Sequence, residues 1–101
     1  HADIYGKAAN FMSENIYEKL SLSDISNYCG VCKTTLNDVF KEFTGCGCMS
    51  FFRELKLEEA KKMLLFGKSC GFVSDSLGFS SQAHFTKCFK TLYGYTPNKI
   101  R

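Results

Sequence analysis

Two short stretches of the sequence carry polar side chains that can form directional hydrogen bonds. Thr34 and Asn37 lie in the first stretch, and Gln82 and Lys87 lie in the second. A carboxamide can form two hydrogen bonds to adenine, Thr can contact a base or a phosphate, and Lys can reach guanine or a phosphate. The candidate DNA contacts on these stretches are Lys33, Thr34, Asn37, Asp38 and Lys41, and then Ser81, Gln82, His84, Lys87 and Lys90.

These side chains suit different kinds of contact. Asp38 can accept a hydrogen bond from cytosine but is repelled by phosphates, so it suits an anionic partner least. Lys41 and Lys90 lie further along their stretches and suit contacts to a phosphate backbone. His84 can pair with a phosphate when its ring is protonated.

Six cysteines offer a second kind of chemistry. Cys29 and Cys32 form a C-x-x-C, and Cys46 and Cys48 follow after 13 intervening residues, which loosely imitates zinc or redox spacing. A metal- or thiol-responsive module that uses these four cysteines is therefore an alternative function. A structural role is favoured instead, because buried free cysteine behaves as a small hydrophobe. The cysteines at apolar helical positions are Cys29, Cys70 and Cys88.

The distribution of acids, nucleophiles and glycines argues against an enzyme. The 101 residues show no paired acids, no nucleophile with an evident base and no glycine-rich phosphate loop. No run approaches the roughly 20 apolar residues of a membrane span, and no secretory signal is evident. We therefore predict no catalysis, no cofactor and no membrane association. Because the chain begins at His1, we expect it to be part of a longer protein.

The two polar stretches lie within two copies of a short repeat. Residues 36–45 read L-x-x-x-F-K-x-x-x-G, and residues 85–94 repeat this pattern with Phe in place of Leu. Each copy follows a helical stretch that ends in Gly and an apolar residue. A helix, a glycine turn and a second helix form a helix-turn-helix. The repeat therefore predicts two recognition helices, over about 33–43 and 81–92, for two stretches of one duplex.

The remaining sequence predicts further helices around these two. A first helix runs from a cap at Asp3 to about Asn15, and a short helix capped by Ser23 ends at Gly30. A long helix over about 50–66 is apolar around much of its circumference. The side chains expected to face the core from the two recognition helices are Leu36, Val39, Phe40 and Phe43, and Phe85, Cys88, Phe89 and Leu92.

The C-terminal third adds two short helices. One precedes Gly78, and another opens with Thr96 as N-cap and Pro97 in the first turn. No region alternates between apolar and polar residues for long enough to predict a strand. We expect an all-α fold of about seven helices, with helix-turn-helix subdomains at 1–48 and 68–101 joined by a linker helix at 49–67.

Positive charge is concentrated toward the C-terminus. Residues 61–101 contain seven Lys or Arg and one Asp, whereas residues 1–60 contain six Lys or Arg and nine acids. A basic block can be the footprint of a polyanion, although an ordinary solvated surface can have the same composition.

The most specific pattern in the chain is residues 78–90, GFSSQAHFTKCFK, followed by Gly94-Tyr95-Thr96-Pro97. This pattern resembles the signature of the AraC/XylS family of transcriptional regulators. Residues 36–45 and the stretch FFRELKLEEAK at 51–61 resemble the same family, so the likeness covers nearly the whole chain. The resemblance implies a homeodomain-like DNA-binding domain of seven helices. Its two recognition helices would enter successive major grooves on one face of the duplex.

The resemblance also implies particular contacts and partners. By position it implies base contacts from Thr34, Asn37 and Asp38 in the first unit and from Gln82, Ala83, His84 and Lys87 in the second. It implies transcription regulation with double-stranded DNA and RNA polymerase as partners, in the bacterial cytoplasm at the nucleoid. It further implies a separate N-terminal effector-binding or dimerisation domain.

Four positions depart from the family pattern. Asp38 stands where a basic or neutral polar residue is usual, and Cys32 replaces the usual Ser cap. Gly71 and Ser74 stand where Ala or larger apolar residues are usual. Since Gly costs about 1 kcal/mol relative to Ala inside a helix, we expect the helix before Gly78 to be marginally stable.

Overall fold

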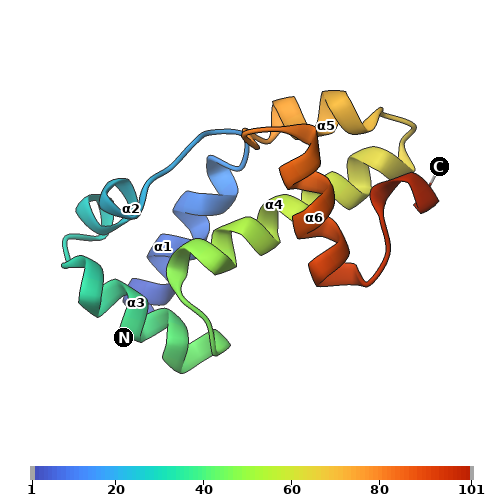
Figure 1. Ribbon diagram of the computed structural model, residues 1–101. Helices are drawn as coiled ribbons and strands as arrows, with labels where there is room; N and C mark the ends of the chain where they lie inside the picture. Colours follow the sequence, from blue (N-terminus) through green and yellow to red (C-terminus); the bar gives the residue numbers. More distant parts are fainter. Residues whose placement is uncertain (1, 101) are drawn as a thin grey trace. The chain divides into compact units, whose positions relative to one another are not determined.

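The regular structure of the chain is helical throughout the part that the structure describes. The computed structural model describes residues 2–100, and these contain six α-helices and a short 3-10 helix (Figure 1). The expected all-α fold of about seven helices is confirmed, with a 3-10 turn as the last element. The helices are α1 (Ala2–Glu14), α2 (Leu22–Cys29), α3 (Lys33–Thr44), α4 (Cys48–Leu65), α5 (Cys70–Ser76), α6 (Gln82–Tyr93) and η1 (Pro97–Ile100).

The chain divides into two compact units. The first comprises His1–Ile16 and Leu20–Leu55, and the second comprises Tyr17–Lys19 and Lys56–Arg101. Helix α4 therefore contributes its first half to one unit and its second half to the other. The segment 17–19 belongs to the second unit, although the helices on either side of it belong to the first.

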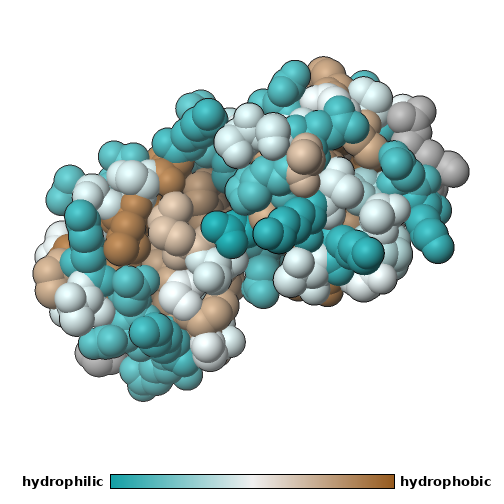
Figure 2. All heavy atoms as spheres, viewed as in Figure 1, coloured by the Kyte–Doolittle hydropathy of each residue, from teal (hydrophilic) through white to brown (hydrophobic). Residues whose placement is uncertain are grey.

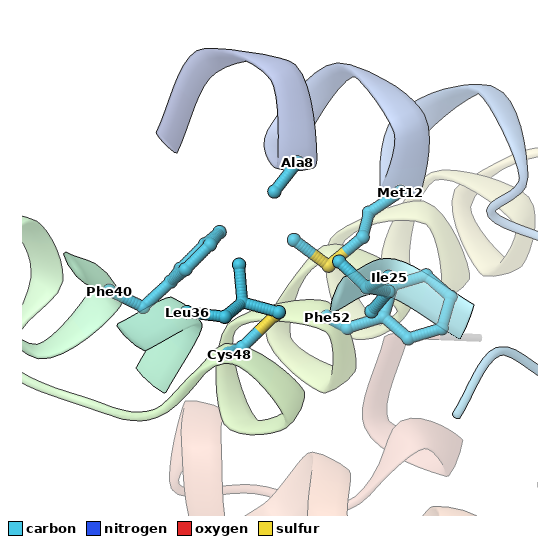
Figure 3. Close-up of a cluster of buried hydrophobic side chains, with 7 residues drawn as sticks. All are labelled: Ala8, Met12, Ile25, Leu36, Phe40, Cys48 and Phe52. Carbon is cyan, nitrogen blue, oxygen red and sulfur yellow. The ribbon is translucent and has the colours of Figure 1, made fainter. Parts of the chain in front are cut away.

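The first unit is built around apolar side chains from α1, α2, α3 and the start of α4. Figure 3 shows these side chains directed toward one another from the four helices. Tyr5 extends this cluster, with its ring centroid 5.1 Å from that of Phe40 and 5.9 Å from that of Phe51. The buried members are Ala8, Met12, Ile25, Leu36, Phe40, Cys48 and Phe52.

The second unit has an aromatic core centred on α6. Phe85 and Phe89 are fully buried, with ring centroids 5.9 Å apart. Phe79 packs on Phe85 at 5.2 Å, and Tyr93 packs on Phe89 at 4.6 Å. The other buried apolar residues of this unit are Leu57, Ala60, Leu64, Cys70, Val73, Leu77 and Pro97.

A glycine in the left-handed region makes the turn of each helix-turn-helix. Gly30 after α2 has φ of 71°, and Gly78 after α5 has φ of 75°. Residues with a Cβ rarely adopt this conformation, so glycine lets the chain leave the helix sharply. The turns predicted at these two glycines are confirmed.

The N-terminal ends of α1 and α2 differ from expectation. Helix α1 begins at Ala2, so Asp3 lies in its first turn and is not its cap. Helix α2 is capped by Ser21, and Ser23 lies inside it, so the predicted cap at Ser23 is wrong. Ser21 Oγ accepts from the Asp24 N–H, and the Asp24 carboxylate accepts from the Ser21 N–H at 2.9 Å. This reciprocal pairing satisfies two N–H groups, which the single cap at Ser23 would not.

Some predicted core side chains lie nearer the surface. Phe43 is 47% exposed and stacks on Tyr5 with ring centroids 4.9 Å apart, and Leu92 is 39% exposed. Cys88 is half-buried. These residues lie toward the ends of apolar stripes or at their margins, where the packing elements no longer cover them.

Candidate nucleic-acid interface

Helix α3 presents a polar face at the surface of the first unit. Lys33, Thr34, Asp38 and Lys41 are exposed, while the opposite face buries Leu36, Val39 and Phe40. Cys32 occupies the N-cap position but makes no capping hydrogen bond from its side chain. The predicted position of Cys32 is therefore confirmed, and α3 begins without the side-chain acceptor that Ser would supply.

Asn37 has a structural contact that sequence reasoning missed. Its Oδ1 accepts a hydrogen bond from the backbone N–H of Cys48 at 3.1 Å, and the residue is half-buried. Cys48 is the first residue of α4, whose early N–H groups have no partner within the helix. Asn37 thus ties α3 to the start of α4 through its carboxamide oxygen, while its amide nitrogen can still donate to other groups.

Replacing Asn37 with Ala is expected to lower the free energy of unfolding by about 1 kcal/mol, the usual cost of losing a helix N-terminal acceptor. Asn37→Asp keeps an oxygen acceptor at this helix N-terminus and is expected to retain most of the stability. Urea unfolding of both variants beside the parent chain measures the difference. A stability of Asn37→Ala equal to that of the parent would show that the contact with Cys48 contributes nothing.

Helix α6 presents the corresponding face of the second unit. Gln82, Ala83, Lys87 and Lys90 are exposed on it, and Ser81 Oγ caps the helix by accepting from the His84 N–H at 3.0 Å. Either Ser80 or Ser81 could cap this helix from the sequence, and the structure shows that Ser81 does. In the view of Figure 1, α6 faces the reader, and Figure 2 shows a mainly hydrophilic surface over it.

His84 is exposed but held by its neighbours. Its Nδ1 lies 3.4 Å from Ser80 Oγ, and its Nε2 lies 3.5 Å from Cys88 Sγ. The Phe79 ring lies edge-on to the imidazole at 5.9 Å. A base contact from His84 would therefore have to compete with two existing contacts of its ring nitrogens.

Gly71 leaves space beside the candidate contact Gln82. A Cβ at Gly71 would lie 3.4 Å from Gln82 Oε1, at the near limit of ordinary contact. Ser74, on the same helix, donates its hydroxyl to the Gly71 carbonyl at 3.2 Å. The two departures from the family pattern thus lie inside α5, as expected, and one of them borders a candidate DNA contact.

Lys56 is the structural residue of the second unit that sequence reasoning missed. It is 7% exposed, and its Nζ donates to the carbonyls of Glu18 at 2.8 Å and Leu77 at 2.5 Å. Burial lowers the pKa of this ammonium, the Lys19 charge lowers it further, and Glu18 opposes both. Leu77 immediately precedes the turn at Gly78, so Lys56 supports the turn that leads to α6. The sequence did contain a signal for this burial, because Lys56 lies four residues from both Phe52 and Ala60 on an apolar face of the helix.

The four cysteines considered as metal ligands do not form a ligand cluster. Among residues 2–100, no group of three or more His, Cys, Asp or Glu side chains could hold a metal ion. Cys48 is buried, and burial, with a contribution from Cys29, raises its pKa to about 12. Cys32 and Cys46 instead lie beside the hydroxyls of Thr35 and Thr44. The structure thus offers no support for the metal-responsive alternative.

Comparison with known proteins agrees with this geometry. A helix-turn-helix domain family model matches residues 25–101. The solved structure of a transcriptional regulator from Chromobacterium violaceum, described among AraC-type DNA-binding domain-containing proteins, is 32% identical with a TM-score of 0.93. The match covers 99% of this chain and 90% of that one. The chain belongs to the AraC-type helix-turn-helix family. The AraC/XylS resemblance predicted from residues 78–90 is thereby confirmed.

Two curated relatives place this AraC-type domain in context. The probable transcription factor PqrA of Proteus vulgaris is 38% identical over 86 residues, which cover 83% of this chain and 70% of PqrA. The HTH-type transcriptional regulator ArgR of Pseudomonas aeruginosa is 31% identical over 96 residues, which cover 94% of this chain but 29% of ArgR. The AraC-type domain thus spans less than a third of ArgR but most of PqrA. None of the helices described between residues 2 and 100 is long and apolar enough to cross a membrane.

Proposed function

We propose that this AraC-type domain binds double-stranded DNA in a sequence-specific manner and regulates transcription. Each unit would contribute one recognition helix, α3 or α6, to major grooves of the same duplex. The observation that carries the proposal is that both units have a helix, a left-handed glycine and a second helix with exposed polar side chains. In a helix-turn-helix the second helix reads base edges from its N-terminal residues.

The two units are expected to contribute unequally to DNA binding. On α6, Gln82 can read a base while Lys87 and Lys90 supply positive charge, and no acid follows Asp75 in the sequence. On α3, the Asp38 carboxylate would approach the phosphates and Asn37 already accepts from Cys48. We therefore propose that the second unit supplies most of the DNA affinity and that the first unit adjusts the preference for particular DNA sequences.

The wider role is proposed from the family. Since the domain spans only 29% of ArgR, we propose a further effector-binding or dimerisation domain in the full protein. RNA polymerase is proposed as a second partner, and the bacterial cytoplasm, at the nucleoid, as the location. The proposed role involves binding without catalysis.

Selection of bound sequences from random double-stranded DNA tests the proposal directly. We expect an enriched motif, and an affinity that falls steeply with salt because bound phosphates release counterions. The spacing of the conserved positions reports whether both recognition helices are used. If the folded domain enriches no motif above its nonspecific background, sequence-specific binding is refuted.

Gln82→Ala and Lys90→Ala separate base reading from phosphate contact. Gln82→Ala is expected to lose about 1–3 kcal/mol of discrimination at particular base pairs, whereas Lys90→Ala weakens all sequences alike and lowers the salt slope by about one. Binding titrations on the selected site and on single-base variants, at several salt concentrations, provide the measurement. Lys62→Ala, an exposed lysine outside the proposed interface, is the control. Uniform weakening by Gln82→Ala would contradict the assignment of Gln82 to base reading.

A further inference from the structure

Three side chains lie in series at the surface of the second unit. Ser80 Oγ lies 3.4 Å from His84 Nδ1, and His84 Nε2 lies 3.5 Å from Cys88 Sγ. His84 and Cys88 are four residues apart on α6, so the helix itself keeps the imidazole and the thiol adjacent. The sequence analysis did not pair Cys88 with His84, and the structure places their side chains in contact. A thiol, a base and an orienting hydroxyl are the parts of an activated nucleophile.

One tautomer of His84 places a base beside the thiol. When Nδ1 carries the ring hydrogen and donates to Ser80 Oγ, the lone pair of Nε2 faces the Cys88 thiol. The edge-on Phe79 ring at 5.9 Å further restricts rotation of the imidazole. His84 is thus oriented to accept the thiol proton when the sulfur reacts. His84 is the only histidine among residues 2–100, so it is the only described imidazole that contacts a cysteine.

The remaining cysteines are placed differently. Burial raises the pKa of Cys48 to about 12 and also raises that of Cys29. Cys70 is buried and contacts Asn98. Cys46 is half-buried, and its Sγ lies 3.3 Å from the hydroxyl of Thr44. Cys32 is the stronger competing thiol, because it is exposed and contacts with Thr35 lower its pKa. Its neighbour Thr35 Oγ1, at 3.1 Å, is a hydroxyl and cannot hold the thiol proton during a reaction.

From this geometry we infer that Cys88 is a modification site that undergoes reversible thiol–disulfide exchange with low-molecular-weight disulfides, with His84 as the base. Cys88 Sγ attacks one sulfur of the disulfide, and a new S–S bond forms as the original S–S bond breaks. The thiol proton passes to His84 Nε2 and then to the departing thiolate. Cys88 is thereby oxidised to a mixed disulfide, and one thiol of the small molecule is released in reduced form. Excess thiol reverses each step.

The consequence for DNA binding rests on the proposed function. Cys88 follows Lys87 directly on α6 and contacts His84, so an adduct there lies beside the side chains proposed to face DNA. The adduct has to extend outward, because Phe85 and Phe89 fill the interior behind this helix. Modification is therefore expected to weaken DNA binding by about tenfold or more, comparable to the loss of one base contact.

The reaction is tested on the whole chain with glutathione disulfide as the probe, without DNA. Digestion and mass spectrometry give the rate of mixed-disulfide formation at each cysteine. We expect Cys88 to react first, and His84→Gln to slow Cys88 by about tenfold or more while Cys32 changes less than twofold. His84 is exposed, so this replacement spares the core. An unchanged rate at Cys88 in His84→Gln, or faster modification of Cys32 in the parent chain, would overturn the inference.

A second measurement separates this inference from the proposed function. DNA affinity is measured for the parent chain, Cys88→Ser and Cys32→Ser, each before and after treatment with glutathione disulfide. The parent and Cys32→Ser are expected to lose affinity and to recover it with dithiothreitol, whereas Cys88→Ser keeps its affinity. Equal sensitivity of Cys88→Ser overturns the regulatory consequence. Absence of DNA binding in untreated protein refutes the proposed function instead, while the modification rates still decide the role of Cys88 and His84.

Discussion

Phe40→Ala is expected to unfold the first unit while leaving the second unit largely folded. Phe40 is fully buried, and its ring centroid lies 5.1 Å from both Tyr5 and Phe51. Truncating a buried Phe to Ala costs about 3–5 kcal/mol, because the lost apolar contacts leave a cavity. Small domains are stable by only about 5–15 kcal/mol in total. Each unit contains about half of the chain, so this loss removes most of the free energy of unfolding of the first unit.

Phe89→Ala is the matched variant in the second unit, where Phe89 is also fully buried between Tyr93 and Tyr95. Native-state hydrogen exchange measures both variants residue by residue. We expect Phe40→Ala to remove protection from α1–α3, and Phe89→Ala to remove it from α5 and α6. Equal loss of protection over all helices in both variants would show that the two units unfold as one. On the selected DNA site, Phe40→Ala should lose the contacts made by the first unit, and Phe89→Ala should lose those made by the second unit.

Lys56→Met is expected to lower the free energy of unfolding by about 2–3 kcal/mol, the range of a hydrogen bond to a charged group. The replacement keeps the length of the side chain and removes the ammonium. In the parent chain the carbonyls of Glu18 and Leu77 both accept from Lys56 Nζ. In the variant both carbonyls lose this donor. The Leu77 carbonyl belongs to the C-terminal end of α5, where carbonyls lack partners inside the helix. The turn at Gly78 and the start of α6 should loosen first.

Lys62→Met provides the control for Lys56→Met, because Lys62 lies on the same helix and is exposed. An exposed substitution of this kind usually changes stability by less than about 0.5 kcal/mol. Urea unfolding gives both values, and hydrogen exchange at residues 77–84 reports the turn. If Lys56→Met is as stable as Lys62→Met, the buried ammonium does not hold this turn.

Local patterns in the sequence predicted most of the helices. Gly30 and Gly78 marked the two turns, and the spacing of Leu36 and Phe40 placed their side chains on a buried face. These features depend on neighbours within one helical turn, so they can be read from residues three or four apart. Local patterns did not decide which of two serines, Ser21 or Ser23, caps α2. Ser21 caps α2 in place of Ser23, because its partner Asp24 completes a reciprocal pair of hydrogen bonds.

The candidate interface was predicted in outline but not in detail. The polar residues of α3 and α6 could be chosen because each helix has a clear apolar face. The contact of Asn37 with Cys48 joins residues 11 apart and depends on how the chain turns between two helices. The pairing of His84 with Cys88 needed only helical spacing, and it was missed because Cys88 was assigned to the core.

The sequence by itself thus determined the all-helical class, the two glycine turns and the family, because these rest on short-range patterns and on one specific signature. Tertiary structure decided which polar groups are free to act. Lys56 donates to carbonyls 38 and 21 residues away along the chain, and Tyr17 donates to Glu59 across 42 residues. Such contacts join segments far apart in the sequence, so no local periodicity predicts them. The burial of a side chain and the position of its donor are set only when the chain has folded.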